Sequence, residues 1–420
     1  MKFIADFHIH SKYSRATSKE MEVETLGRWA RKKGIDLMGT GDFTHPFYLS
    51  ELKTKLEPKG NGLFQLKRGD KKTDFILTGE VSNIYHQGGR LRKIHTVIFA
   101  PSIKVVEKIN TKLAGKGKLS ADGRPIFGFS AKNLVKLVLD ISEECLLVPA
   151  HAWTPWFSLF GANSGFDSLE ECFEEEVNNI YAIETGLSSD PSMNRRLSQL
   201  DRICLISNSD AHSPPKIGRE ANVFDCERDY RTIMEVIKNK DRQRFLFTIE
   251  FYPEEGKYHY DGHRNCQILF SPKESQEVNN ICPVCKKALT IGVMHRVDDL
   301  ADREEGFKPE NSIPARYVVP LGEIIADAFG VSVGTKAVDN EYDRLIEWGG
   351  SEFKILLDIE KEELSRYAHP KVSEGVMRVR EGKLNIVPGY DGVFGKIKIF
   401  EESKEQGFDE DEQKEQMNLF

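Results

Sequence analysis

Short apolar runs alternate with amphipathic stretches over about the first 250 residues of the chain. The apolar runs predict strands at 3–9, 37–40, 75–77, 97–100, 145–150, 180–183 and 203–207. Apolar residues recur at helical spacing at 23–33, 131–141 and 192–200. This alternation predicts an α/β fold with a mostly parallel sheet. Because no Gly-x-Gly-x-x-Gly turn follows these strands, the pattern favours a β/α barrel over a dinucleotide-binding sheet.

The pattern changes near residue 245. A strand is predicted at 245–252, a segment with three cysteines follows, and helices are predicted at 321–329, 340–346 and 352–367. A glycine-rich turn at 388–392 then separates two short apolar strands. We therefore expect a barrel over residues 1–244 and a second lobe, partly helical, over residues 245–400.

The composition is typical of a soluble protein with more than one domain. The chain has 420 residues, of which 39% are hydrophobic and 30% are charged, and this length suits about two or three domains. The first ten residues lack the basic and apolar regions of a signal peptide. No stretch reaches the roughly 20 apolar residues of a membrane helix. We therefore expect a cytoplasmic protein that has no membrane partner.

Charge is distributed unevenly along the chain. The net charge is −7, but the last twenty residues alone carry eight acidic residues and two lysines. The rest of the chain is therefore nearly neutral and can hold a basic surface. Eight basic residues and one acidic residue lie between Arg90 and Lys118. This segment is equally compatible with a solvated surface and with a track for phosphate groups.

The first predicted strand ends in the pattern Asp6-x-His8-x-His10. Because side chains alternate between the two faces of a strand, these three share one face while Phe7 and Ile9 point into apolar packing. Two imidazoles that converge at a strand end suit a metal ion, although a surface pair of histidines would give the same pattern.

The edges of the other predicted strands carry more residues of the types that bind metals: Asp42, His45, Glu80, His95, His151, Glu184, Asp210 and His212. In a β/α barrel the strand ends meet at one face, where active sites form. The set therefore predicts a site for several metals. Adjacent divalent ions lower the pKa of a bound water and clamp phosphate oxygens, so hydroxide could attack a phosphate ester there. Glu184 could orient a histidine ligand or serve a structural role.

A second metal motif lies in the second lobe. His263-x-x-Cys266 is followed, after fifteen residues, by Cys282-x-x-Cys285. This spacing predicts one tetrahedral structural zinc, with His259 or His295 as alternatives to His263. The other cysteines stand alone in apolar or helical contexts and are expected to be buried thiols: Cys145, Cys172, Cys204 and Cys226.

The barrel motifs as a set resemble those of the PHP (polymerase and histidinol phosphatase) family over about 250 residues. The resemblance implies a distorted (β/α)7 barrel with two or three divalent metals. It implies these ligands: His8, His10, Glu80 and Asp210 for one metal, Glu80, His95 and His151 for a second, and Asp42 and His212 for a third. The chain departs from the family at the third metal, because Asp42 stands where many members have histidine. Tyr13 and Ser14 stand near the place of another missing histidine.

The segments after the barrel extend this resemblance to the endonuclease Q family over nearly the whole chain. They are 258–266 (YHYDGHRNC), 282–285 (CPVC), 292–297 (GVMHRV) and 388–392 (PGYDG). The resemblance implies a metal-dependent endodeoxyribonuclease of DNA repair, associated with the nucleoid. It would cut the phosphodiester 5′ of uracil, hypoxanthine, xanthine and abasic sites, with Glu80, Asp210 and His212 as catalytic residues. Histidine-rich ligation favours zinc, manganese or iron over magnesium in the barrel.

An enzyme that reads a damaged base must unstack it, and damaged pairs open at lower cost. Trp153 and Trp156 follow His151 in an aromatic loop. They are candidates to stack on the extruded base, although core packing is the commoner fate of such residues. Arg90 and Arg92 are candidates to contact DNA in the basic segment.

The chain ends in an acidic tail, residues 401–420, which we expect to be disordered. Its last residues, Gln416-Met417-Asn418-Leu419-Phe420, resemble the peptide that binds the bacterial sliding clamp, with Met417 in place of a leucine. The pattern predicts clamp binding through Gln416, Met417, Leu419 and Phe420. A tail that merely frays is the alternative.

Two other functions compete with DNA repair. A small-molecule phosphatase of the histidinol-phosphate type would use the same barrel, but it leaves the zinc motif, the helical lobe and the tail unexplained. A non-catalytic DNA-binding protein would not need so nearly complete a set of metal ligands.

Overall fold

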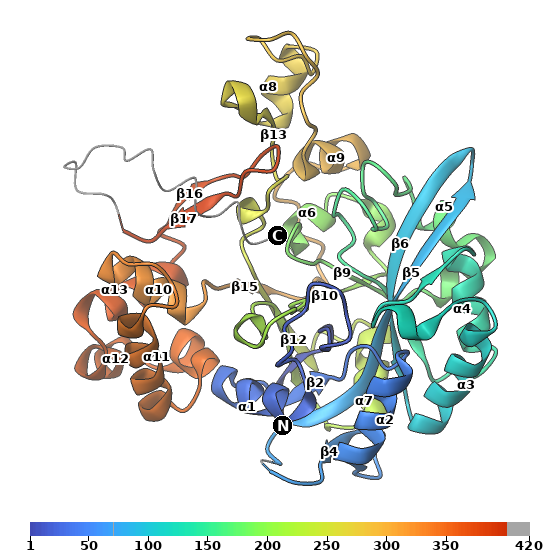
Figure 1. Ribbon diagram of the computed structural model, residues 1–420. Helices are drawn as coiled ribbons and strands as arrows, with labels where there is room; N and C mark the ends of the chain where they lie inside the picture. The colour runs from blue at the N-terminus through green and yellow to red at the C-terminus, as the bar shows by residue number, and fades with distance from the viewer. Residues whose placement is uncertain (70, 401–420) are drawn as a thin grey trace.

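The computed structural model describes residues 1–69 and 71–400. Within these residues, the strands of a distorted barrel (Figure 1) are β1 (Lys2–Asp6), β2 (Leu37–Gly39), β5 (Asp74–Gln87), β6 (Arg90–Ala100), β8 (Leu146–Pro149), β9 (Ala182–Glu184) and β10 (Cys204–Ile206). Each overlaps a strand predicted from the sequence. The predicted α/β barrel is therefore confirmed.

The connectivity explains the distortion of the barrel. β1, β2 and β5 run parallel, as do β9 and β10. β6 runs antiparallel to both β5 and β8. A bridge between Ile9 and Ala211 joins the chain beyond β1 to the chain beyond β10. The carboxyl ends of the parallel strands thus converge on one rim.

The long hairpin of β5 and β6 exceeds its predicted length. The sequence predicts strands of three and four residues, whereas β5 has 14 residues and β6 has 11. Polar residues such as Glu80, Ser82 and Asn83 interrupt the apolar run, yet they are buried in the sheet. Their burial places polar side chains inside the barrel, which a count of apolar residues cannot anticipate.

Several strands extend the barrel sheet at its edges. β11 (Ala221–Asp225), β12 (Phe245–Glu250) and β15 (Ala315–Tyr317) continue the sheet beyond β1. β3 (Leu56–Pro58), β4 (Phe64–Leu66) and β7 (Ile126–Phe127) are added beside β5. Because β12 and β15 follow residue 245 and still pair with the barrel sheet, the domain division at that residue stays a prediction.

Helices surround the barrel: α1 (Val23–Lys33), α2 (Pro46–Lys55), α3 (Ile103–Ala114), α4 (Ala131–Leu139), α5 (Leu169–Phe173), α6 (Pro191–Asn194) and α7 (Tyr230–Lys238). α1 matches its predicted bounds. Its buried Val23, Leu26 and Ala30 follow helical spacing, and Gly34 ends it with a left-handed φ of 90°. The helix predicted at 192–200 is wrong, because α6 ends at Asn194 and Leu197 has extended backbone.

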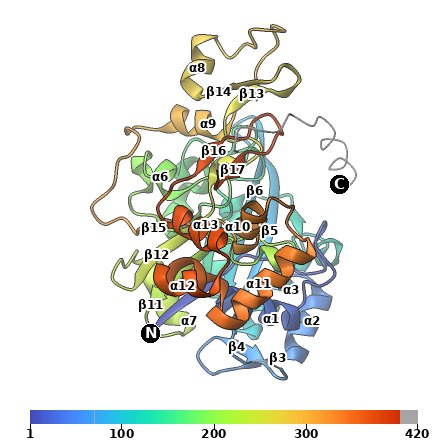
Figure 2. The same ribbon diagram turned by 90° about the vertical axis from the view of Figure 1, so that its left-hand side faces the viewer.

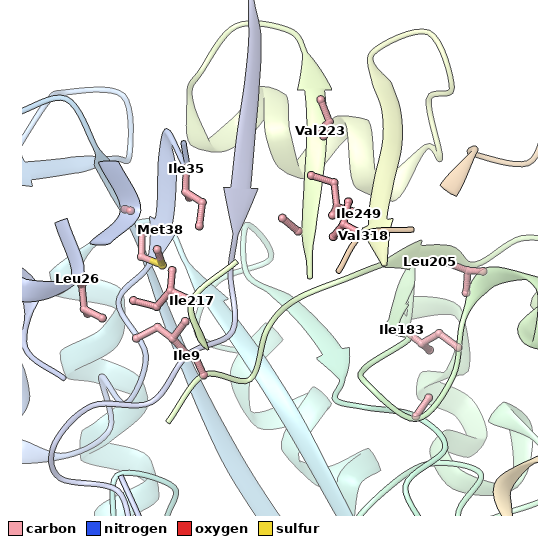
Figure 3. Close-up of a cluster of buried hydrophobic side chains, with 14 of the residues drawn as sticks. Ile9, Leu26, Ile35, Met38, Ile183, Leu205, Ile217, Val223, Ile249 and Val318 are labelled. Carbon is pink, nitrogen blue, oxygen red and sulfur yellow. The ribbon is translucent and has the colours of Figure 1, made fainter. Parts of the chain in front are cut away.

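Two apolar clusters hold the barrel strands. Figure 3 shows one of them, in which Ile9, Met38 and Ile217 lie side by side. The other contains Phe7 and a stack in which the Phe224 ring lies 5.4 Å from Phe3 and 4.5 Å from Phe245. Phe7 and Ile9 are thus buried in apolar packing on either side of His8, as the alternation of a strand predicts.

The second lobe has three parts (Figures 1 and 2). The helices α10 (Leu321–Phe329), α11 (Lys336–Gly349), α12 (Lys361–Tyr367) and α13 (Pro370–Arg380) form one. The strands β13 (Asp261–His263) and β14 (Ile268–Phe270) and the helices α8 (Pro272–Glu277) and α9 (Val293–Leu300) form another. The hairpin of β16 (Asn385–Val387) and β17 (Lys396–Lys398) lies between them in both views.

The helix predicted at 352–367 is wrong, because it is broken at Ile359. A π-helical turn (Lys354–Asp358) precedes the break, and α12 begins only at Lys361. The Arg380 guanidinium donates hydrogen bonds to the carbonyls of Ile355 and Leu356, at 2.8 and 2.7 Å. These side-chain donors satisfy carbonyls that a continuous helix would have paired within itself.

A buried ion pair joins the barrel to the helical lobe. Lys33, at the end of α1, lies 2.7 Å from Glu352, and their side chains are 7% and 4% exposed. Glu352 also accepts hydrogen bonds from the Leu321 amide at 3.0 Å and the Tyr342 hydroxyl at 2.7 Å. Its carboxylate therefore ties α1, α10 and α11 together.

Among the residues that the structure describes, no helix combines the length and the apolar character that crossing a membrane requires.

Substitution of Glu352 by alanine is expected to destabilise the protein strongly. Removing one partner leaves Lys33 buried without its counter-charge, which typically costs about 3–5 kcal/mol in the free energy of unfolding. The control is Asp343→Ala, which removes the exposed partner of Lys32 and should cost less than about 1 kcal/mol. Urea unfolding measures both, and equal losses would contradict a special role for Glu352.

Candidate functional site

Four side chains meet at the barrel mouth. His8 and His10 follow β1, Glu80 lies in β5, and Asp210 follows β10. His10 Nε2 lies 3.1 Å from Asp210 Oδ1 and 3.3 Å from Glu80 Oε2. His8 Nε2 lies 3.6 Å from Glu80 Oε2 and 3.7 Å from Asp210 Oδ1. Ligand atoms at about 2.1 Å from a tetrahedral metal lie roughly 3.4 Å from one another, so this spacing suits one metal ion.

The other carboxylate oxygen of Glu80 belongs to a second group. Glu80 Oε1 lies 2.9 Å from His95 Nδ1 and 3.2 Å from His151 Nε2. The same two imidazole nitrogens are 3.2 Å apart. Glu80 therefore contributes one oxygen to each group, as a carboxylate that bridges two metals does.

Buried carboxylates orient the histidines of the first group. His8 Nδ1 lies 3.0 Å from both oxygens of Glu184, and His10 Nδ1 lies 3.0 Å from Asp42 Oδ1. A carboxylate at Nδ1 fixes the tautomer and turns Nε2 toward a metal. Glu184 also accepts a hydrogen bond of 2.8 Å from the His151 amide, so it positions residues of both groups.

The converging atoms fit divalent metals. Nε2 of His8 and of His10, Oε1 of Glu80 and Oδ1 of Asp210 are buried and lack a hydrogen-bond partner among the described residues. Each buried polar atom without a partner costs about 1–3 kcal/mol. Three of these atoms belong to the first group and Glu80 Oε1 belongs to the second, so both groups call for a ligand. Imidazole nitrogens and carboxylate oxygens together suit zinc, manganese or iron.

Burial and the opposite charges act against each other in this site. Burial alone would raise the pKa of Glu80, but His95, Arg124 and His8 hold it well below its ordinary value. Burial would likewise raise the pKa of Asp210, and the nearby imidazoles of His10 and His8 hold it well below its ordinary value. Both carboxyl groups are therefore ionised and available as ligands at neutral pH.

The residues expected at a third metal do not form a third group. Asp42 Oδ1 faces His10, while Oδ2 accepts hydrogen bonds of 2.6 Å from the Ser11 amide and 2.9 Å from the Ser14 hydroxyl. His212 Nδ1 lies 2.9 Å from the Asp210 carbonyl, and its ring stands 4.5 Å from that of His10. Asp42 therefore orients a histidine, and its expected place as a ligand of a third metal is not supported.

Three of the predicted residues have unusual backbone conformations. The φ angles of Asp42, His151 and Asp210 are 45°, 30° and 47°. Such conformations cost on the order of 1–3 kcal/mol each outside glycine and gather at functional sites. They occur just after β2, β8 and β10, where each turns a side chain toward the barrel mouth.

Arg124 is the residue of the site that the sequence analysis missed. Its guanidinium Nη1 lies 3.1 Å from Glu80 Oε2, and its side chain is 25% exposed. It belongs to a turn before β7, which carries no ligand motif, so only the folded structure brings it to the site. His45, which the sequence placed near the site, stacks instead on Tyr13, with the ring centres 4.4 Å apart.

The zinc motif of the second lobe is brought together by β13 and the turn at Cys282–Cys285. The ligand atoms of His263, Cys266, Cys282 and Cys285 lie within 4.8 Å of one another. The alternative ligand His295 lies 2.5 Å from Asp261 instead, and His259 stacks on Tyr260. His263 is therefore the best-placed histidine for the fourth position.

The residues proposed to contact DNA have different environments. Trp153 is 1% exposed, packs on Phe160 and donates a hydrogen bond of 2.8 Å to Asn194, so its predicted stacking on a base is wrong. Trp156 is 44% exposed and meets Tyr258 of the second lobe edge to face.

Arg92 and Arg90, the two arginines proposed to contact DNA, also have different environments. Arg92 donates to the Gly165 carbonyl and stacks over Phe166, which makes it part of the support of the aromatic loop. Arg90 is exposed at the tip of the hairpin between β5 and β6. The clamp-like residues Gln416, Met417, Leu419 and Phe420 lie outside the described residues.

A pair of carboxyl groups is buried behind the site. Glu220 and Glu250 are both 0% exposed, and Glu250 accepts a hydrogen bond of 3.2 Å from the Thr185 hydroxyl. Burial and the neighbouring acids raise the pKa of both groups, that of Glu250 to about 8. Glu250 is therefore mostly protonated at neutral pH.

The fold and the two joined groups define a metal-dependent phosphoesterase with a barrel of the PHP type. Over 95% of each chain, the structure is similar to the lesion-specific endonuclease PfuEndoQ from Pyrococcus furiosus, with 31% identity and a TM-score of 0.85. A complex of endonuclease Q with a 27-mer duplex that carries an abasic lesion at its active site is also similar, at 31% identity and a TM-score of 0.83, over 96% of this chain and 97% of that one. The chain belongs to the endonuclease Q family.

The sequence relatives agree with this assignment. The uncharacterized protein YqxK of Bacillus subtilis is 30% identical over 413 residues, which are 94% of this chain and 99% of YqxK. The uncharacterized protein MJ0043 of Methanocaldococcus jannaschii is 32% identical over 258 residues, which are 59% of this chain but only 31% of MJ0043. Residues 320–383 match the family model of the MJ0043 C-terminal domain.

Substitution Glu184→Gln is expected to weaken metal binding in the barrel by about 10- to 100-fold, because His8 loses the charge that orients it. Competition with a fluorescent chelator measures the affinity. Glu175→Gln, at a side chain that is 66% exposed, is the control and should bind metal as the native chain does. Native affinity in Glu184→Gln would show that the carboxylate does not position the ligands.

The buried pair also predicts a pH dependence of stability. The folded pKa of Glu250 is about 8 against an ordinary value of 4.5, so between these values the unfolded chain has lost a proton that the folded chain retains. The free energy of unfolding should therefore fall as the pH rises through this window. Glu250→Gln should reduce that fall and be more stable than the native chain at pH 8, whereas the exposed control Glu143→Gln should not. The midpoints of urea unfolding, measured across this pH range, test the prediction. If Glu250→Gln showed the same dependence of stability on pH as the native chain, Glu250 would not be the group responsible.

Proposed function

We propose that this protein is a DNA repair endonuclease that hydrolyses the phosphodiester on the 5′ side of deaminated bases and abasic sites. The observation that carries the proposal is the pair of ligand groups joined by Glu80, because two adjacent metals suit phosphodiester hydrolysis. The similarity to endonuclease Q, one example of which holds an abasic duplex, supports DNA as the substrate. Uracil, hypoxanthine and xanthine are proposed as substrate bases from the sequence resemblance.

The bound metals would supply Lewis acidity, lowering the pKa of the attacking water and neutralising phosphate oxygens. The side chains of the protein position the ligand groups and move protons. Glu80 sets the distance between the two ligand groups. Glu184 and Asp42 fix the orientations of the His8 and His10 imidazoles, respectively. His212 donates from Nδ1 to the Asp210 carbonyl, so Nε2 of the neutral ring is a proton acceptor; it can take a proton from the attacking water and, from the imidazolium form, pass it to the leaving oxygen. Its side chain is 32% exposed, which leaves it accessible to a substrate.

The donor sets suggest which metals bind. Histidine and carboxylate ligands in the barrel favour zinc, manganese or iron, with magnesium a weaker candidate. The group of His263 and three cysteines suits one structural zinc. A closed site of this kind would stabilise the small subdomain of β13, β14 and α8, which buries few apolar side chains of its own.

We propose that DNA lies across the barrel mouth, between the barrel and the second lobe. Trp156 is an exposed aromatic ring beside Tyr258, so the two rings can stack on an extruded base. Arg296 of α9 donates hydrogen bonds to the carbonyls of Phe160 and Phe166, at 3.0 and 3.1 Å. These bonds attach the aromatic loop to the second lobe, so both would move as one surface.

Basic residues offer a route for the phosphate backbone. Lys104, Lys108 and Lys112 are exposed on α3 at intervals of four residues, and Arg90 is exposed at the tip of the β5–β6 hairpin. Cations spaced along one face suit the phosphates of a duplex. The division of the chain at residues 245 and 401, the binding of the sliding clamp by residues 416–420 and a place at the nucleoid are proposals that rest on the sequence alone.

Cleavage of a labelled duplex with one uracil tests the proposed function. The metal-loaded protein should nick the strand on the 5′ side of the uracil, and chelator should abolish nicking. His8→Ala should lower the rate by at least about 100-fold, since it removes a ligand whose charge stabilisation is of that order. Arg231→Ala, at a side chain that is 85% exposed, is the control and should nick at the native rate.

Three outcomes would overturn this function. Nicking that persists with chelator would exclude a metal mechanism. Equal cleavage of undamaged duplex would remove lesion specificity. Release of phosphate from small monoesters without nicking would make the protein a small-molecule phosphatase.

A further inference from the structure

Arg124 stands beside the bridging carboxylate although no ligand motif contains it. Its guanidinium Nη1 lies 3.1 Å from Glu80 Oε2, the oxygen that also faces His10 and His8. Glu80 is 0% exposed at its side chain, whereas that of Arg124 is 25% exposed. One end of the guanidinium is therefore held by the site, and part of the side chain remains accessible from the barrel mouth.

The turn that carries Arg124 is fixed from several sides. The Arg124 amide donates a hydrogen bond of 3.0 Å to Asp122, and the Gly123 amide donates one of 3.0 Å to the Tyr13 carbonyl. The Thr44 hydroxyl donates to the Gly123 carbonyl at 3.0 Å. The loops after β1 and β2 thus hold the turn, so the guanidinium is placed before any substrate arrives.

The same turn closes off Asp42. A Cβ atom on Gly123 would lie 2.3 Å from Asp42 Oδ2 and 2.3 Å from Ser14 Oγ, which means that the Gly123 backbone rests directly on these groups. With Oδ1 on His10 and Oδ2 on Ser11 and Ser14, Asp42 has no oxygen turned toward the barrel mouth. A third metal would therefore lack the ligand that the family pattern assigns to it.

Charge in the site calls for a further cation. Glu80, Asp210, Asp42 and Glu184 are carboxylates within or around the two groups, and a phosphodiester adds another negative charge. The Arg124 guanidinium, 3.1 Å from the Glu80 carboxylate, is a cation already placed among these charges. An arginine remains protonated at any working pH and presents paired N–H donors that match phosphate oxygens.

We propose that Arg124 is a catalytic residue whose guanidinium binds the nonbridging oxygens of the scissile phosphodiester, in the role that a third metal would otherwise fill. The proposal rests on the proposed function, since it names the group that this site offers to a phosphate ester. It assigns the barrel two metals and one arginine.

The reaction that Arg124 assists is a hydrolysis without oxidation or reduction. A bond forms between the water oxygen and phosphorus, and one ester P–O bond breaks with its electron pair remaining on the leaving oxygen. Of the two hydrogens of the water, one ends on the leaving oxygen and the other is released to solvent or to the phosphate. Negative charge grows on the phosphoryl oxygens as the bond forms, and fixed donors there stabilise the transition state more than the bound substrate.

A purely positioning role is the rival interpretation. In that case Arg124 would only hold Glu80 in place, and its removal would loosen both metals. The two interpretations differ in metal content, which a catalytic role leaves unchanged. They also differ in the binding of phosphate, which a positioning role alters only through the metals.

The test compares Arg124→Ala and Arg124→Lys with the exposed control Arg231→Ala in the full-length, metal-loaded protein. Arg124→Ala should retain the native metal content, measured by inductively coupled plasma mass spectrometry. Its single-turnover rate on the uracil duplex should fall by about 100- to 1000-fold while the affinity for that duplex changes by less than about 10-fold. Arg124→Lys should recover part of the rate, because it restores the charge without the paired donors.

Binding of inorganic phosphate, measured by calorimetry, separates this inference from the proposed function. Arg124→Ala should bind phosphate at least about 10-fold more weakly than the native chain, in line with the loss of one charge-assisted contact, even if no DNA is cut. Loss of metal in Arg124→Ala would overturn the proposal, as would three barrel metals in the native chain. Native phosphate affinity in Arg124→Ala, or a native cleavage rate where the native chain cuts, would also overturn it.

Discussion

The site depends on one buried carboxylate, that of Glu80, which turns one oxygen toward each of two ligand groups. Isolated in the barrel it would take up a proton, because burial disfavours its charge. His95, His8 and Arg124 reverse that tendency and keep it ionised. The distance between the two ligand groups is then set by the two oxygens of one carboxylate, and not by the packing of separate loops. An ionised Glu80 at this buried place requires cationic partners. Bound metals would supply positive charge beyond that of the histidines.

The barrel makes this convergence possible at a cost in backbone energy. β1 is anchored on both sides by apolar residues, so His8 and His10 have no freedom to turn away. Asp42, His151 and Asp210 follow their strands in left-handed backbone, a strain that packed strands can sustain. The buried Lys33–Glu352 pair ties the helical lobe to the same framework, so the surface around the barrel mouth is built from both halves of the chain.

The barrel strands and most of the ligand residues could be predicted from the sequence, because the spacing of apolar residues and the location of ligand residues at strand ends carry this information. Alternation along β1 separates His8 from Phe7, and convergence of parallel strands gathers the other ligands. What could not be predicted depends on contacts between distant segments. Arg124 is one arginine among many until its turn is held by the loops after β1 and β2. Trp153 and Trp156 share one aromatic loop, and only packing shows that the first is buried and the second exposed. The break at Ile359 likewise reflects donors from Arg380, twenty-one residues further along the chain.

The most direct measurement is the metal content of Glu80→Gln, which keeps the shape of the side chain but removes its charge. The account predicts that this variant loses both barrel metals together and retains the zinc of the His263 group, so that the content falls from three metals per chain to one. Loss of a single barrel metal, or of none, would contradict the claim that Glu80 joins the two groups into one centre.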